Sequence, residues 1–95
     1  MDRDISQIIE ALRSSECGTG AFDAIIERYS ERLYWHIRRI LVQHESSEDA
    51  LQETFVKAFL AAKSFRGDSE GSLVAWLYKI ATTEAIRSLR RRKRY

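Results

Sequence analysis

Hydrophobic residues recur along this chain at intervals of three and four positions, and the sequence contains no proline. Such spacing puts apolar side chains on one face of an α-helix, whereas a half-buried strand alternates every second residue. No clean alternating stretch is present. The pattern therefore predicts an all-α fold, a compact bundle of four helices in which one short N-terminal helix precedes three longer ones.

Polar and glycine-containing stretches set the limits of the first two predicted helices. The first runs from Ile5 to Ser14, with Asp4 as its N-cap and Gln7 placed to complete a capping box. A linker turn follows over Ser15–Gly20, which contains two glycines. The second helix is predicted over Ala21–Val42, and its broad apolar face indicates neighbours on two sides.

Each of the last two predicted helices begins at a serine. One residue of the pair Ser46–Ser47 caps the third helix, which runs to Lys63, and the acidic side chains that follow suit the positive end of the helix dipole. A loop is predicted over Ser64–Gly71. Ser72 then caps the fourth helix, Leu73–Arg92.

The third helix combines a predicted buried stripe with a polar outer face. The stripe consists of Ala50, Leu51, Phe55, Ala58, Phe59 and Ala62. The outward positions are Gln52, Glu53, Val56 and Lys57. Carboxylate and amide groups are therefore expected on the solvent side of this helix.

The composition fits one soluble domain: the chain has 95 residues, of which 44% are hydrophobic and 32% are charged. No apolar run approaches the roughly 20 residues of a membrane span, and no apolar stretch follows the polar start Met1–Asp4. The lone Cys17 cannot form an internal disulfide. We therefore expect a cytoplasmic protein without membrane insertion.

The net charge is only +2, but the charges are unevenly distributed. Six basic residues and no acid occur between Arg87 and Arg94, whereas acidic residues gather upstream at Glu45, Glu48, Asp49 and Glu53. A cationic pole favours nucleic acid as a partner. The alternative is a solvated helix end whose cations only favour the dipole of the last turn, although six basic residues exceed what capping requires.

Catalysis is poorly supported. The two histidines, His36 and His44, are eight residues apart, and neither an HExxH nor a CxxC motif is present. Metal and nucleophile sites need several convergent ligands or a base within reach. We therefore predict no enzyme, no catalytic residue, no metal site and no cofactor.

Aromatic and basic residues interleave around the start of the fourth helix. The loop contributes Phe65, Arg66, Asp68 and Ser69, and the helix contributes Trp76, Tyr78, Lys79, Thr83, Arg87, Arg90 and Arg91. Aromatic rings that stack on bases, beside cations that hold phosphates, are typical of single-stranded nucleic-acid binding. The alternative is that Phe65, Trp76 and Tyr78 are core residues.

Several of these stretches resemble one known family. DALQETF (Asp49–Phe55) is followed by SFRGD (Ser64–Asp68), AWLYKIA (Ala75–Ala81) and LRR (Leu89–Arg91), and YSERLY precedes them. In this order and spacing they resemble region 2 of bacterial RNA polymerase sigma factors of the extracytoplasmic-function (ECF) group, part of the sigma-70 family. The resemblance covers residues 21–94.

The resemblance implies two partners. Asp49, Gln52 and Glu53 match the polar positions that dock on the clamp helices of the largest subunit of core RNA polymerase. The loop and the fourth helix match the surface that recognises and melts the −10 promoter element, where a flipped base of the non-template strand is captured. Thr83 stands where many relatives carry asparagine, and Arg87 stands where an acid is common. An anti-sigma factor is a further partner that the resemblance implies.

The resemblance also implies a domain organisation. Residues 1–20 form an N-terminal helix and turn, residues 21–94 form region 2, and the second domain of such sigma factors is absent, so we expect a fragment of a longer protein. A helical protein–protein interaction domain with a basic tail is the alternative function. A repressor that reads duplex DNA with a recognition helix is disfavoured, because the positive charge lies at the C-terminal end of the fourth helix.

Overall fold

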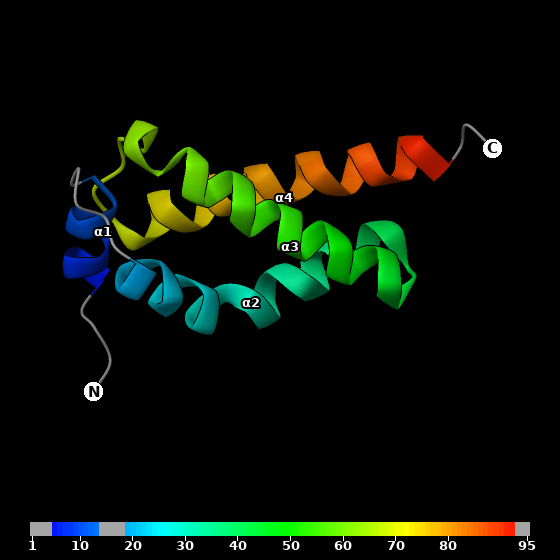
Figure 1. The fold of residues 1–95 in the computed structure, drawn as a ribbon, viewed down its shortest axis with the longest axis horizontal. Coiled ribbons are helices and arrows are strands. Elements are labelled where there is room, and N and C mark those ends of the chain that lie inside the picture. The colour runs from blue at the N-terminus through cyan, green and yellow to red at the C-terminus, as the bar shows by residue number, and fades with distance from the viewer. Residues whose placement is uncertain (1–4, 14–18, 93–95) are drawn as a thin grey trace.

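The computed structural model describes residues 5–13 and 19–92, and within them every regular element is helical. The elements are α1 (Ile5–Arg13), α2 (Thr19–Leu41), α3 (His44–Leu60), the 3₁₀ turn η1 (Ala62–Ser64) and α4 (Glu70–Arg92) (Figure 1). The prediction of an all-α bundle of one short and three longer helices is confirmed. The predictions for Asp4, Ser14 and Cys17 fall outside the described residues.

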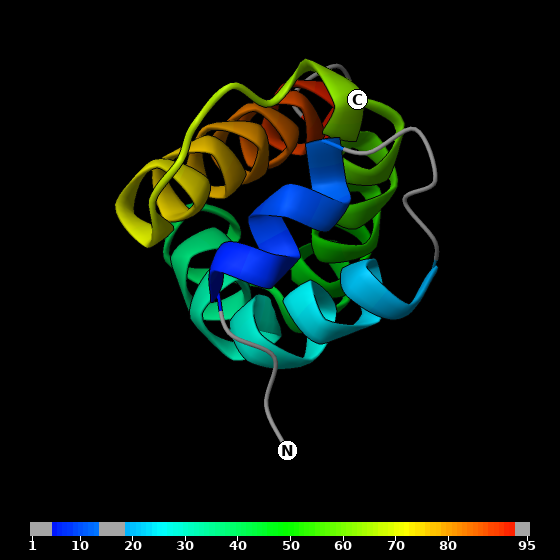
Figure 2. The same ribbon diagram turned by 90° about the vertical axis from the view of Figure 1, so that its left-hand side faces the viewer.

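The three long helices each pack against the other two, and α1 lies across one end of the bundle (Figures 1 and 2). α1 covers that end by contacting α2, η1 and α4. None of the described helices is both long enough and apolar enough to cross a membrane.

The core is built from the apolar stripes that the three- and four-residue spacing predicts. Its largest fully buried apolar and aromatic side chains are Ile8, Leu12, Ile25, Tyr29, Leu33, Ile37, Leu73 and Leu77. Burial of each large side chain contributes about 1.5–3 kcal/mol. The stripe of α3 departs from the prediction, because Phe59 is 45% exposed while Ser47 and Thr54 are buried. The Phe59 ring still meets Phe22 edge-on, with 5.3 Å between ring centroids.

The turn between α2 and α3 is shorter than predicted, and Ser46–Ser47 does not cap α3. Val42 adopts a left-handed φ of 68°, which ends α2 and reverses the chain within two residues. α3 therefore begins at His44 after Gln43, whose side chain makes no cap. The Ser47 hydroxyl lies inside the helix and donates to the Gln43 carbonyl oxygen at 2.6 Å.

The start of α4 also differs from the prediction, because Ser69 rather than Ser72 is the capping residue. The Ser72 backbone N–H donates to Ser69 Oγ at 3.2 Å, and the Ser69 N–H donates to Ser72 Oγ at 3.1 Å. These reciprocal bonds form a capping box, in which Ser72 takes the place of the usual glutamate or glutamine. Two orphan N–H groups are satisfied, so the helix begins at Glu70 instead of Leu73.

Two further helix limits move by a few residues. α2 begins at Thr19, two positions before the expected Ala21, and α3 ends at Leu60 instead of Lys63. Beyond Leu60 the chain tightens into η1, where the Ser64 N–H bonds to the Ala61 carbonyl oxygen at 2.9 Å. The 3₁₀ turn satisfies carbonyl groups at the end of α3 and leads into the loop.

Candidate interface for nucleic acid and polymerase

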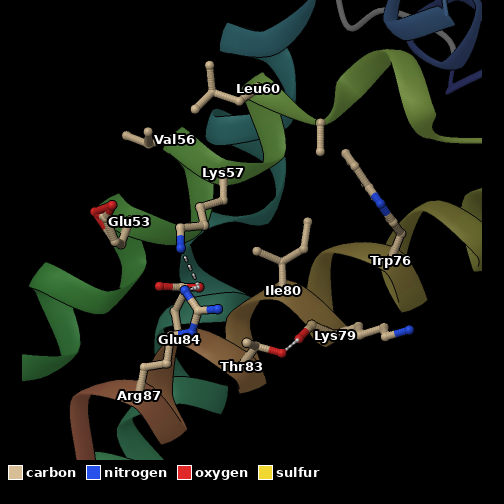
Figure 3. Close-up of a pocket in the computed structure, with 11 residues that line it drawn as sticks. Glu53, Val56, Lys57, Leu60, Trp76, Lys79, Ile80, Thr83, Glu84 and Arg87 are labelled. Carbon is tan, nitrogen blue, oxygen red and sulfur yellow. Dashed lines mark hydrogen bonds and ion pairs between the residues drawn. The ribbon is translucent and has the colours of Figure 1, made fainter. Parts of the chain in front are cut away.

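An open groove of about 570 Å³ runs between α3 and α4 (Figure 3). It is lined by Glu53, Val56, Lys57, Leu60, Ala61, Trp76, Lys79, Ile80, Thr83, Glu84 and Arg87. Its apolar lining includes Leu60, which is 76% exposed, and Val56, which is 50% exposed. Apolar side chains of this size in the open indicate a surface that meets a partner.

The groove also holds a buried carboxylate between two cations. Glu84 is only 4% exposed, and its Oε2 lies 3.4 Å from Lys57 Nζ and 3.8 Å from an Arg87 guanidinium nitrogen. Since an unpaired carboxylate would be costly at this depth, the two cations are what make its burial possible. Figure 3 shows Lys57 reaching from α3 to Glu84 on α4. The pairing therefore joins the two walls of the groove.

The groove continues toward the C-terminal end of α4 as a second hollow of about 380 Å³. Arg90 and Arg91 line it together with Glu53, Lys57, Glu84 and Arg87. Four cations here face two carboxylates. An anionic chain such as a phosphate backbone would meet a net positive surface at this end.

Four of the predicted DNA-binding residues lie together along this groove. Trp76, Lys79, Thr83 and Arg87 all line it from α4, and the last three are exposed. Their spacing of three and four residues places them on one face of the helix. Thr83 donates its hydroxyl to the Lys79 carbonyl oxygen at 3.0 Å, so its oxygen can only accept from a partner.

The structure separates two aromatic residues from this set. Tyr78 faces α2, where its ring centroid lies 4.7 Å from that of His36. His36 Nε2 in turn lies 2.7 Å from Thr82 Oγ1 on α4. Phe65 is 3% exposed and packs against Trp76, with ring centroids 5.1 Å apart. Tyr78 therefore packs between α4 and α2, and Phe65 is a core residue against Trp76. The DNA-binding role of both residues stays a prediction.

The loop before α4 presents its polar side chains outward. Arg66, Asp68 and Ser69 are exposed, as a binding role requires. The Arg66 guanidinium donates to the Lys63 carbonyl oxygen at 2.7 Å, which holds the tip of that side chain against η1. Phe65 joins the loop to Trp76, which lines the groove, so the loop adjoins the groove at this residue.

The predicted polymerase-docking residues Asp49, Gln52 and Glu53 are all exposed on α3. Glu53 also lines the groove beside Arg87, so the acidic and cationic surfaces adjoin. The sequence had indicated two separate patches, because it could not show how α3 and α4 pack.

The burial of Glu84 was likewise missed. Its position three residues before Arg87 is the only local signal, and its partner Lys57 lies on another helix.

Among the described residues, no group of three or more histidine, cysteine or acidic side chains is placed to hold a metal ion. His44 instead takes part in a surface cluster, where Nδ1 lies 2.6 Å from the Tyr34 hydroxyl and Nε2 lies 2.9 Å from Glu48. Both histidines therefore have structural partners in this fold.

Comparison with known proteins gives a consistent result. The family model for Sigma-70 region 2 matches residues 25–95. The RNA polymerase sigma-H factor of Pseudomonas aeruginosa is 33% identical over 79 residues, which are 83% of this chain and 39% of that protein. The ECF RNA polymerase sigma factor SigW of Bacillus subtilis is 34% identical over 73 residues, 77% of this chain and 38% of that protein.

A third relative, the ECF RNA polymerase sigma factor SigG of Mycobacterium tuberculosis, is 37% identical over 75 residues, 79% of this chain and 20% of that protein. The chain thus spans less than half the length of each of these relatives. No solved structure matches it significantly. The resemblance noted in the sequence is confirmed, and since the family model covers most of its length, the chain belongs to the sigma-70 region 2 family, in the ECF group.

Proposed function

We propose that this chain is a transcription-initiation module that docks on core RNA polymerase through α3 and recognises and helps melt the promoter −10 element with α4 and the preceding loop. The observation that carries the proposal is the alignment of Trp76, Lys79, Thr83 and Arg87 along one groove beside an exposed polar loop. The names of the relatives, all RNA polymerase sigma factors, support the same assignment.

Docking would use the exposed α3 face, where Asp49, Gln52 and Glu53 offer carboxylates and an amide to a basic or polar partner helix such as the polymerase clamp. Exposed Val56 and Leu60 continue this face with apolar area. A polar rim beside an apolar patch is the usual composition of a protein–protein interface. The same surface is open to an anti-sigma factor, which we include among the proposed partners.

Promoter opening would need no bond to be broken. Lys79, Arg87, Arg90 and Arg91 would hold phosphates, and the exposed part of Trp76 would stack against an unpaired base. The loop residues Arg66, Asp68 and Ser69 would read the edges of a base extruded from the helix. Because the stacking and base-edge contacts exist only for separated strands, their binding free energy would shift the duplex toward the open form. The place of action would be the cytoplasm, where polymerase and promoter meet.

A co-purification assay tests the docking half of the proposal. The double substitution Gln52→Ala with Glu53→Ala is expected to abolish retention on immobilised core polymerase. It removes polar contacts to the polymerase and leaves the hydrophobic core of the chain unchanged. Gln7→Ala with Glu10→Ala is the matched control, since these residues have the same chemistry, the same exposure and a place on α1. Equal retention of both variants would contradict the proposal.

A selection experiment tests the DNA half. The chain assembled on core polymerase is expected to enrich one short motif from a random pool of single-stranded oligonucleotides, and to bind it better than a scrambled version. Lys79→Ala and Arg87→Ala are each expected to reduce the salt dependence of binding by about one phosphate contact. Equal binding of motif and scrambled sequence, lost together at moderate salt, would favour the interaction-domain alternative.

A further inference from the structure

The loop between η1 and α4 is anchored to the core by Phe65, while Arg66, Asp68 and Ser69 are exposed. Phe65 is buried against Trp76, and the backbone at Gly67 passes close to Phe65 and Ser72. The capping box between Ser69 and Ser72 closes the other end of the loop. Arg66, Asp68 and Ser69 are thereby presented from a constrained backbone.

One further contact reaches this loop from a different helix. The Tyr29 hydroxyl on α2 donates to Glu70 Oε2 at 2.8 Å, across 41 residues of sequence. Tyr29 is only 1% exposed, so its ring is held by the core and its hydroxyl has a fixed position. Arg28 Nε lies 3.9 Å from the same carboxylate oxygen. Glu70 directly follows Ser69, so α2 holds the last residue of the loop through Glu70.

No part of the proposed docking or DNA contacts uses Tyr29 or Glu70, and the bond is more than general helix packing. An apolar ring would fill the space that Tyr29 occupies, whereas the hydroxyl specifies where the Glu70 carboxylate lies. A charge-assisted bond of this kind is stronger than a neutral one. It fixes the orientation of the first turn of α4, on which the Ser69–Ser72 capping box depends.

We propose that Tyr29 is a positioning residue for base recognition, which acts through Glu70 to hold the loop in the shape that selects a base. This inference rests on the proposed function of the loop. It predicts that loss of one hydroxyl, which itself makes none of the proposed DNA contacts, reduces the discrimination among bases more than it reduces total binding.

The test measures the affinity of the chain, assembled on core polymerase, for the selected single-stranded motif and for its single-base variants. Wild-type chain is expected to discriminate at one position or more. Tyr29→Phe is expected to lower the largest ratio of affinities about three- to tenfold. This change corresponds to about 0.7–1.4 kcal/mol, a part of the free energy of one hydrogen bond to a charged group. Glu70→Ala breaks the same link from a half-exposed position and is expected to have the same effect.

Tyr34→Phe is the matched control, because it also removes a hydroxyl from α2. That hydroxyl bonds to His44 Nδ1 at 2.6 Å and accepts from Arg38 at 2.8 Å, at the α2–α3 turn. It is expected to leave the ratio unchanged. Glu70→Gln keeps an acceptor oxygen and is expected to restore most of the discrimination. Hydrogen exchange at the Ser69 and Ser72 amides is expected to accelerate in Tyr29→Phe and Glu70→Ala only.

The outcomes separate the two proposals. If the wild-type chain shows no base preference, the proposed function fails and this inference fails with it. If the wild-type chain discriminates but Tyr29→Phe keeps the same ratio, or weakens all oligonucleotides equally, only the positioning role is overturned. Failure of Glu70→Gln to recover discrimination also overturns it.

Discussion

At the scale of single residues, Gly67 is the position where the chain has least room. An added Cβ would overlap Ser72 Oγ and lie 2.6 Å from both Phe65 Cζ and Ser72 Cβ. We expect Gly67→Ala to lower the free energy of unfolding by about 1–3 kcal/mol, because overpacking forces the buried Phe65 and the capping serine to move. Urea denaturation followed by circular dichroism measures the change.

Gly71 provides the control for this prediction. A Cβ there would meet nothing closer than Ser69 Oγ at 3.8 Å, and the residue lies in the first turn of α4. Gly71→Ala is expected to be neutral or to stabilise by up to about 1 kcal/mol, since alanine favours the helix. If both substitutions destabilise equally, crowding at Gly67 is not the cause.

Tyr29 makes stability depend on pH in the alkaline range. Burial raises the pKa of Tyr29 from 10.0 to about 12, with a smaller contribution from the hydrogen bond to Glu70 and its negative charge. Because the folded state holds the phenol proton more tightly, this stabilisation is complete below pH 10 and is lost as the pH rises toward 12. Its size is roughly 2–3 kcal/mol, from about 1.4 kcal/mol per pKa unit.

The measurement compares wild-type chain with Tyr29→Phe by urea denaturation between pH 9 and pH 12. The wild-type chain is expected to be the more stable at pH 9 and to lose that advantage as the pH rises. The two proteins differ only in the Tyr29 hydroxyl, so the difference between them isolates its contribution. A difference that stays constant across this range would show that Tyr29 ionises normally.

At the scale of the helices, Glu84 is the main polar link between α3 and α4. We expect Glu84→Gln to lower the free energy of unfolding by about 1–3 kcal/mol, because Lys57 and Arg87 lose their buried partner. The loss is below that of a fully buried pair, since both cations are partly exposed and can turn to water. Chemical denaturation measures it.

Glu48→Gln is the comparison for Glu84. Glu48 pairs with His44 at 2.9 Å one turn away on the same helix, and both side chains are exposed. A surface pair of this kind contributes at most about 0.5 kcal/mol. Equal losses for the two substitutions would mean that burial of Glu84 adds nothing.

The existence of the helices follows from local periodicity, but their starts do not. Ser46–Ser47 has the residue type of a cap, yet the left-handed Val42 ends α2 so sharply that α3 starts earlier. Ser72 also has the residue type of a cap, but Ser69 is the N-cap of α4 and Ser72 is its partner in the capping box. In both cases several serines or polar residues can serve, and tertiary packing decides among them.

The candidate site, like the helix starts, could be predicted only in part, because local spacing does not show how the helices pack. Exposure of Gln52 and Glu53 follows from the pattern of α3 alone. The separation of Tyr78 from Trp76 could have been anticipated, since two residues along a helix lie about 200° apart around it. The burial of Glu84 could not, because it depends on Lys57 from another helix. Local spacing assigns faces, and only packing shows which faces meet.

At the scale of the whole molecule, Glu53 stands where the proposed docking and DNA surfaces adjoin. Its carboxylate lines both hollows of the groove with Arg87. We expect Glu53→Gln to raise affinity for single-stranded DNA about two- to fivefold at low salt, because one repulsive charge is removed, and to weaken retention on core polymerase. Fluorescence anisotropy and co-purification give the two readouts.

Glu10→Gln, an equivalent change on the exposed face of α1, serves as its control. It raises the net charge by one in the same way but lies on α1 at one end of the bundle, outside the residues that line the groove. If it raises DNA affinity as much as Glu53→Gln does, the effect comes from total charge and not from the position of Glu53.

The connection between α2 and α3 is only two residues long, which restricts how far the two helices can move relative to each other. Val42 and Gln43 alone join those helices, and cross-links from Tyr29 to Glu70 and from Lys57 to Glu84 tie α4 to both. A bundle joined in this way resists a change of shape when it binds a partner. Under the proposed function, such a stiff chain would leave the distortion to the double helix. Promoter sequences whose base steps unstack at little cost would then be preferred, even at positions that no side chain touches.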